Sequence, residues 1–383
     1  MKLRNRIVNV YTLAALITAI SAALGFALHS EPVSAGDPTT VIVAGLNNPR
    51  GIDIGPDGSL FVAEAGVGGS GPCADGPEGM RCYGASGAIA RVDLQDGTLT
   101  RVTADMPSLA SPDGSFATGV HDVSFLGLGN GHFTTGFGGN PSDRADFGPA
   151  GGDFARVGRI SAKKGKWSLL EDMGEYETAN NPAGDEVDTN PYGVLSLPGR
   201  QVVADAGANA LNQITTNGEI STLAIFPDRL VDAPPFLELP PGTQIPMDAV
   251  PTSVGLGPDG DYYIGQLTGF PFPVGGANIY RVPAQGGMAV AVEGGFTAVI
   301  DVTFGPDGSM YVLEIAKNGL LAAFGDGDWT GALIRIYPDG TRTELASGTL
   351  FAPGGVTVND DGTIYVTNNS IFSGSGQVIR IEQ

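Results

Sequence analysis

Residues 51–63 read GIDIGPDGSLFVA, and residues 301–313 read DVTFGPDGSMYVL. Both stretches hold a short apolar segment, a Pro-Asp-Gly turn and a second apolar segment. Proline presets φ, aspartate caps its own backbone and glycine accepts a positive φ, so the triplet predicts a tight hairpin. A similar arrangement recurs as SVGLGPDGDYYIG at 253–265 and as GVTVNDDGTIYVT at 355–367. We therefore expect the chain to repeat one β-hairpin unit.

Two further copies keep the apolar start of this unit without its turn signature. The six equivalent first-strand residues are spaced 71, 71, 60, 48 and 54 residues apart: Ile52, Val123, Val194, Val254, Val302 and Val356. A third strand follows in each unit, as at 278–282, and a fourth follows in most, as at 341–345. This repetition predicts an all-β fold, a six-bladed β-propeller with four-stranded antiparallel blades.

The two ends of the chain suggest how such a ring closes. The sixth unit stops after its third strand at 377–381, whereas one apolar strand at 41–44 precedes the first unit. An open ring would leave a row of unpaired backbone groups on the last blade. The N-terminal strand is therefore expected to complete that blade.

The first residues carry the signature of export. Lys2, Arg4 and Arg6 precede an apolar run at 10–28, and small residues at 33–35 suit cleavage. We expect a signal peptide at 1–35 and a single propeller domain at 36–383; the alternative is a run retained as a membrane anchor. Export to the periplasm or the extracellular space favours a disulfide between Cys73 and Cys82.

The charge of the chain limits its partners. The formal net charge is −21, and removal of residues 1–35 takes away three basic residues and one acidic residue. Such a surface repels nucleic acid and anionic lipid. We expect a monomer that contacts a membrane only through an uncleaved N-terminal segment.

Several longer motifs point to a family. They are NPRG at 48–51, ETANNP at 177–182, DTNPYG at 188–193, VADAG at 203–207, LTGFPFP at 267–273 and VLEIAKNG at 312–319. With these motifs the chain resembles the ScyD/ScyE family of exported bacterial propellers over residues 40–383. The resemblance implies export, an NHL-like propeller and a link to the biosynthesis of scytonemin, a sunscreen pigment. It supplies no catalytic residues.

Polar residues end the second strand of each unit. The long inserts at 66–87, 136–157, 267–277 and 315–331 follow these strands and should crowd one mouth of the channel. The equivalent residues at that mouth are Glu64, Thr135, Asp205, Gln266, Glu314 and Asn368. The carboxylates of Glu64, Asp205 and Glu314 would suit Ca²⁺, the one cofactor that the sequence suggests. The alternative is a solvated polar lining without a metal.

A second candidate cluster precedes the first strands of three units. Arg50, His121, Asp122 and Tyr192 should face the same opening. A histidine beside a carboxylate can act as a general base, and an arginine can hold an anion. Neighbours in a strand normally point to opposite faces, however, so a structural role for His121 is the alternative.

These features leave two classes of function. The first is a binding or scaffold module that holds a small molecule, a glycan or a protein at the loop-rich face of the channel. The second is a metal-dependent hydrolase or lactonase that uses the carboxylates at the channel mouth. A serine hydrolase is disfavoured because no Gly-x-Ser-x-Gly motif occurs. The apolar run at 270–273 either contacts a hydrophobic ligand or packs under neighbouring loops.

Overall fold

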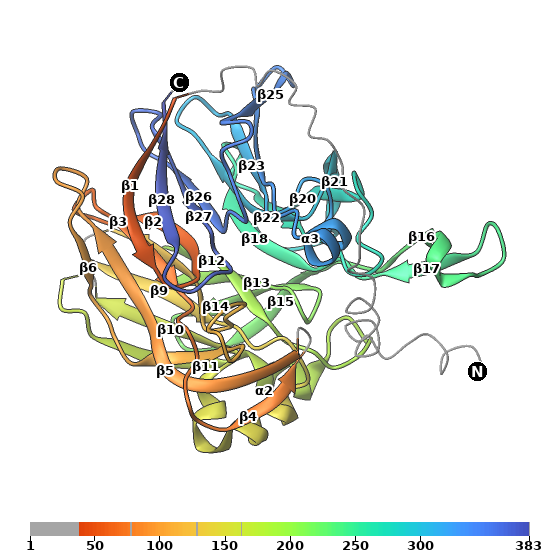
Figure 1. Ribbon diagram of the computed structural model, residues 1–383, viewed down its shortest axis with the longest axis horizontal. Helices are drawn as coiled ribbons and strands as arrows, with labels where there is room; N and C mark the ends of the chain where they lie inside the picture. Colours follow the sequence, from red (N-terminus) through yellow and green to blue (C-terminus); the bar gives the residue numbers. More distant parts are fainter. Residues whose placement is uncertain (1–37, 77–78, 128, 162, 383) are drawn as a thin grey trace, which may run out of the picture.

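The computed structural model describes residues 38–76, 79–127, 129–161 and 163–382. The signal peptide expected at 1–35 lies outside the described residues. Within these ranges, no helix is both long enough and apolar enough to cross a membrane. The described chain is built mainly of antiparallel strands, as Figure 1 shows.

Each repeat forms one antiparallel sheet, named here by its order in the chain. The first sheet contains β2 (Pro49–Ile54), β3 (Leu60–Glu64), β5 (Gly79–Val92) and β6 (Leu99–Arg101), with β4 (Cys73–Gly76) and β7 (Met106–Ala110) added to β5. The second contains β8 (Val120–Leu126), β9 (Asn130–Thr135), β10 (Arg156–Ser161) and β11 (Trp167–Asp172). The third contains β12 (Pro191–Leu197), β13 (Arg200–Asp205), β14 (Ala210–Thr215) and β15 (Ile220–Ile225).

The remaining sheets follow the same order. The fourth contains β18 (Pro251–Leu256), β19 (Tyr262–Gln266), β20 (Ala277–Val282) and β21 (Val290–Phe296). The fifth contains β22 (Val299–Phe304), β23 (Met310–Glu314), β24 (Ala332–Ile336) and β25 (Arg342–Leu345). The sixth contains β26 (Gly355–Val358), β27 (Ile364–Asn368), β28 (Gly376–Ile381) and β1 (Thr39–Leu46).

The first strands of the sheets contact one another in a closed circuit, from β2 through β8, β12, β18, β22 and β26 back to β2. The core lies between the faces of adjacent sheets. Val299 and Val302 of the fifth sheet, for example, pack with Ile279 and Phe296 of the fourth. This arrangement confirms the predicted β-propeller class.

Strand register supports the alignment of the repeats. Ile52 lies opposite Val62 in the first sheet, and Val302 lies opposite Val312 in the fifth. The other four equivalent residues face Phe133, Val203, Ile264 and Val366 at the same place in their second strands. Residues at matching positions in different sheets can therefore be compared directly.

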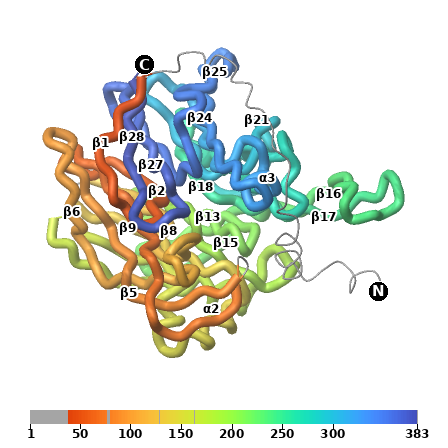
Figure 2. The backbone as a smooth tube through the Cα atoms, in the orientation of Figure 1, coloured from red at the N-terminus to blue at the C-terminus, as the bar shows by residue number. Residues whose placement is uncertain are grey.

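The N-terminal strand closes the ring as expected. β1 pairs antiparallel with β28, with Val41 opposite Ile379 and Leu46 opposite Gly376. Figure 2 shows the red β1 running beside the blue β28. Strands from the two ends of the described chain thus belong to one sheet.

The connections at one end of the ring are long. Besides the inserts after the second strands, this end carries α2 (Met173–Asn180) and the hairpin of β16 (Arg229–Asp232) and β17 (Gln244–Met247), with η3 (Pro235–Leu237) at its tip. It also carries η2 (Pro141–Asp153) and α3 (Leu320–Asp326). The hairpin projects from the body in Figure 1. The sequence analysis missed α2 and this hairpin because both join a fourth strand to the next first strand.

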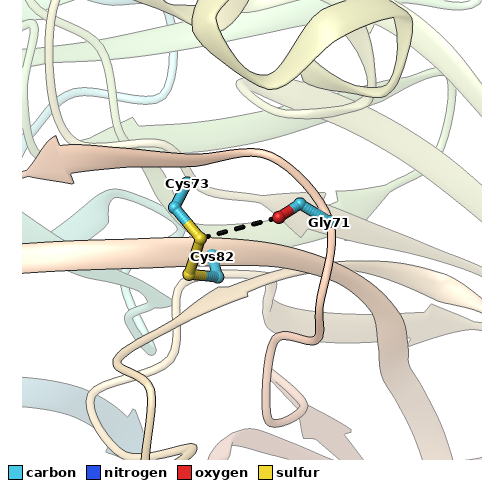
Figure 3. The surroundings of a disulfide bond; sticks show 3 residues. All are labelled: Gly71, Cys73 and Cys82. Carbon is cyan, nitrogen blue, oxygen red and sulfur yellow. Dashed lines mark hydrogen bonds between the residues drawn. A yellow bond between two sulfur atoms is a disulfide. The ribbon is translucent and has the colours of Figure 1, made fainter.

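The predicted disulfide is present. Cys73 and Cys82 are bonded and face each other across β4 and β5 (Figure 3). The bridge spans nine residues of one extension of the first sheet. It therefore stabilises a local hairpin at the loop-rich end and does not connect the sheets.

Deletion of residues 37–46 should destabilise the whole ring, because it exposes the edge of β28. We expect the apparent melting temperature to fall by about 10 °C or more, measured by calorimetry. Deletion of the exposed tip at 234–242 is the control and should leave this temperature nearly unchanged. Equal melting of the β1 deletion and the full-length chain would contradict closure by β1.

Candidate functional site

The polar residues that end the second strands are buried and hydrogen-bonded within their own sheets. Glu64 Oε1, Glu314 Oε1 and Asn368 Oδ1 each accept a hydrogen bond of 2.7 Å from a backbone N–H located 17 residues earlier. These N–H groups belong to the connections that enter the first strands of the same sheets. The side chains therefore hold those connections in place.

Asp205 and Gln266 act in the same way. Asp205 accepts hydrogen bonds from the backbone N–H groups of Asn190 and Ala208 and from the hydroxyl of Thr189. Gln266 Oε1 accepts from the N–H of Asn278 and from Arg229. Thr135 instead donates to Asp153 O.

The three carboxylates expected to bind Ca²⁺ are not brought together as a metal site. In the described ranges, no group of three His, Cys, Asp or Glu side chains is placed to hold a metal ion. Glu64 is also paired with Arg101 at 2.8 Å. The physical reason is that Glu64, Asp205 and Glu314 each bond within their own sheet, so their lone pairs do not converge.

The second predicted cluster is assembled at the channel. His121, Asp122 and Tyr192 line one small cavity, together with Asp301 and Thr252. The rings of His121 and Tyr192 lie 4.6 Å apart. Arg50 lies close by and donates to Ala117 O at 2.8 Å. The cavity measures about 10 Å³, roughly the space of one water molecule.

His121 is not placed to work as a base with Asp122. Burial, with a smaller contribution from the positive charge of Arg50, lowers the pKa of His121 to about 3, so the ring is neutral. The carboxylate of Asp122 accepts the N–H groups of Val123 and Val194 at 2.8 Å. The structure therefore favours the structural role considered for this pair.

Asp122 belongs to a set of polar side chains that join neighbouring first strands. Asp301 accepts the N–H of Val356 in the next sheet, as Asp122 accepts that of Val194. Asp53 accepts the N–H of Phe125, and Ser124 Oγ accepts that of Ser196. We call these four residues the seam residues. They satisfy N–H groups on strand edges that have no further strand to pair with.

Sequence reasoning did not select Asp53 and Asp301. A signal was present, because DVSF at 122–125 repeats as DVTF at 301–304. Glycine residues allow the first strands to approach each other closely at the seams. A Cβ atom added to Gly51 would lie 1.9 Å from Asp122 Oδ1, so the first strands approach too closely for a side chain there.

Gly51→Ala should therefore destabilise the protein by about 1–3 kcal/mol, the usual cost of overpacking. Gly325→Ala is the control, because a Cβ atom there meets nothing within 4 Å and the residue lies in α3. The control should be neutral or slightly stabilising, since alanine favours a helix. Chemical denaturation measures both variants, and equal stabilities would contradict the seam.

The seam carboxylates also make stability depend on pH. Burial raises the pKa of Asp53 to about 6 and that of Asp301 to about 7, and it raises the pKa of Asp122 well above its usual value. Each folded-state pKa exceeds the unfolded value, so the folded state binds more protons between pH 4 and pH 7. The contribution of these groups to stability is full below pH 4 and is lost as the pH rises through 6 to 7.

We therefore expect the free energy of unfolding to fall from pH 6.5 to pH 8, a range in which the buried, neutral His121 contributes little to the change. Each pKa unit corresponds to about 1.4 kcal/mol, so the change should be measurable by denaturation in urea. A free energy of unfolding that rises from pH 6.5 to pH 8 would contradict the assigned directions.

An apolar cluster borders the small cavity. Ile300 and Tyr192, which line this cavity, pack in one cluster with Phe116, Phe272 and Trp329. Phe116 comes from the connection into the second sheet, and its ring lies 5.9 Å from that of Trp329 beside α3. The connection into the second sheet and the insert of the fifth sheet therefore pack against each other. The apolar run at 270–273 takes part in packing through Phe272.

A larger cavity lies at the loop-rich end, beside the fourth and fifth sheets. Its volume is about 350 Å³, within the size range of small-molecule sites. Its lining includes Glu314, Lys317, Asn318, Glu344, Thr297 and Arg342. We call it the lateral pocket. Of the predicted site residues, Glu314 alone contributes to its lining.

The lateral pocket has a counterpart within the same chain. Register places Glu344 of β25 at the position that Arg101 of β6 holds in the first sheet. In the first sheet, Arg101 neutralises Glu64 through contacts of 2.8 Å to both carboxylate oxygens. In the fifth sheet, Glu344 faces Glu314 instead. Burial, with a smaller contribution from the negative charge of Glu344, raises the pKa of Glu314 to about 7.

Lys317 offsets part of this negative charge. Its Nζ atom lies 2.8 Å from Glu344 Oε1. Arg342 is occupied elsewhere, since it pairs with Glu293, donates to Gly294 O and lies over the ring of Phe296. The two carboxylates of Glu314 and Glu344 therefore share the single positive charge of Lys317.

Comparison with known proteins supports the fold. No family model matches the sequence, and no curated protein matches it. A protein of unknown function from Bacteroides thetaiotaomicron is similar in structure, with a TM-score of 0.53 and 10% identity over 90% of this chain and 72% of that one. The virginiamycin B lyase of Staphylococcus aureus gives 0.46 and 15%, covering 90% of this chain and 85% of that one.

A calcium-binding protein, regucalcin from Agrobacterium tumefaciens, gives a TM-score of 0.48 at 12% identity, covering 91% of this chain and 93% of that chain. Identities this low carry no activity over to this chain. The closed circuit of first strands defines the chain as a β-propeller protein.

Proposed function

We propose that the protein is a non-catalytic binding module that holds a small cationic molecule in the lateral pocket. The observation that carries this proposal is the contrast between Arg101 and Glu344. In the first sheet, Arg101 pairs with the buried Glu64. At the equivalent position of the fifth sheet, Glu344 places a second carboxylate near Glu314, beside a cavity of about 350 Å³.

The internal ion pair indicates the chemistry of the ligand. Arg101 contacts Glu64 with two N–H donors, and a free guanidinium or amine could contact Glu314 in the same way. Thr297 and Asn318 supply further polar groups in the lining. The site differs from the expected one, because it lies beside the fifth sheet and not in the channel.

The disulfide bond supports the proposal that the protein is exported. The disulfide fits an oxidising compartment, and the loop-rich end offers a rigid platform outside the cytoplasm. The resemblance to the ScyD/ScyE family extends the proposal to secondary metabolism. A gene neighbourhood without biosynthetic enzymes would count against that extension.

Replacing Glu344 with arginine tests the proposal. Glu344→Arg should recreate the ion pair of the first sheet, fill the pocket and weaken the binding of agmatine by about tenfold or more. Thr343→Arg adds the same residue at the adjacent, exposed position of β25 and serves as the control. Isothermal titration calorimetry at low salt measures both. Unchanged agmatine binding in Glu344→Arg would refute the pocket.

A metal-dependent hydrolase or lactonase is the second candidate. Asp122 and Asp301 favour it, because they line one cavity with His121 and Tyr192. A cavity of about 10 Å³ has room for about one water molecule, so a substrate enters only if the lining residues move. Metal analysis of purified protein and a screen of lactones test this function, and metal-free protein without turnover would eliminate it.

A further inference from the structure

Six carboxylates gather at the loop-rich end, beside the third and fourth sheets, and we call them the acidic patch. They are Glu177 of α2, Asp185 and Asp188 of the next connection, Asp205 at the end of β13, and Asp228 and Asp248 on either side of the β16 and β17 hairpin. Electrostatic coupling links all six. The patch is distinct from the lateral pocket, with which it shares no residue.

Asn209 fixes the segments that carry the patch. Its Nδ2 atom donates to Asp185 Oδ2 at 3.3 Å, and its Oδ1 atom accepts the N–H of Val250 at 2.9 Å. Asp188 Oδ1 lies 2.6 Å from a Cβ atom built on Gly207. The connections before the third and fourth sheets are thereby held against the turn that follows β13.

Basic residues hardly offset this negative charge. Burial raises the pKa of Asp188, and Arg81 opposes part of this rise. Among the described residues, the pKa values of Glu177, Asp185, Asp205 and Asp248 are also raised, first by burial, without an opposing lysine or arginine. Burial, and then the charge of Asp228, raises the pKa of Asp248 to about 6. Elsewhere the chain pairs its acids, as Asp172 with Arg144 and Arg156.

Glu177 is a buried residue of the acidic patch whose hydrogen bonding is incomplete. Its side chain is 1% exposed, yet Oε1 has no hydrogen-bond partner. Burial, then the charges of Asp205, Asp185 and Asp188, raises the pKa of Glu177 to about 8. Buried carboxylates normally have a partner. Asp185, Asp228 and Asp248 are exposed, so the patch runs from a buried acid to the surface.

We propose that the acidic patch binds the alkylammonium groups of a linear polyamine, with Glu177 as the innermost acceptor. The carboxylates are spread from the interior to the surface and, within the described ranges, are not placed as a metal site. An extended molecule with several ammonium groups matches this spread better than one point charge. The proposal is independent of the lateral pocket.

Calorimetric titration with spermidine, at pH 8 and low salt, tests the proposal. The Glu344→Arg variant is used as the background so that binding in the lateral pocket does not contribute. In this background, Glu177→Gln should weaken spermidine binding by about tenfold or more. Glu175→Gln is the matched control, because it removes the same charge from an exposed position of α2 and should change affinity less than about twofold.

A second readout separates binding from nonspecific attraction. Glu177 must release its proton to accept an ammonium group, so affinity should rise from pH 7 to pH 8, the range in which spermidine keeps most of its charge. Because Glu177 is the group that titrates near this range, the rise should disappear in Glu177→Gln.

Three results would overturn the proposal. One is the absence of spermidine binding by the folded chain. Another is an equal loss of affinity in Glu175→Gln and Glu177→Gln, which would indicate attraction to net charge. The third is binding of Ca²⁺ that depends on Glu177 while spermidine does not bind, which would assign the patch to a metal.

Discussion

Unpaired strand edges are the constraint on which this structure depends. Each sheet has an inner edge at the channel and an outer edge, and every buried N–H group on these edges needs an acceptor. At the inner edges the acceptors are seam residues, such as Asp122 for Val194 and Asp301 for Val356. At the outer edge of the sixth sheet the partner strand is β1.

This constraint decides where function can reside. The seam residues join neighbouring first strands, and the cavity beside His121 has room for about one water molecule. The connections at the loop-rich end do not have to supply hydrogen-bond acceptors for the inner strand edges. They carry both the lateral pocket and the acidic patch, and in both places carboxylates outnumber the cations that could neutralise them.

The repeat and its closure could be predicted from sequence because they follow from local patterns. Apolar strands around Pro-Asp-Gly turns set the register, and the position of β1 follows from the incomplete sixth unit. The grouping of His121, Asp122 and Tyr192 was also predicted, since these residues lie near the starts of equivalent strands. The three expected metal ligands do not form a metal site. Strand register predicts where Glu64 and Glu314 lie, but not the backbone N–H groups that donate hydrogen bonds to their oxygens.

The lateral pocket and the acidic patch could not be predicted from local sequence patterns. The contrast between Arg101 and Glu344 emerges only when the fourth strands are aligned by pairing, and these strands have the weakest apolar pattern. The patch depends on how the connections at 181–190 and 226–250 fold over the turn at Asn209. No periodic signal describes such connections.

Native-state hydrogen exchange tests ring closure most directly. If β1 completes the ring, those of its amides that bond to β28 should open only with global unfolding, at the same free energy as the amides of β27. Exchange of the β1 amides at a much lower free energy, with β27 and β28 still protected, would show that the ring is stable without its N-terminal strand and would contradict this account.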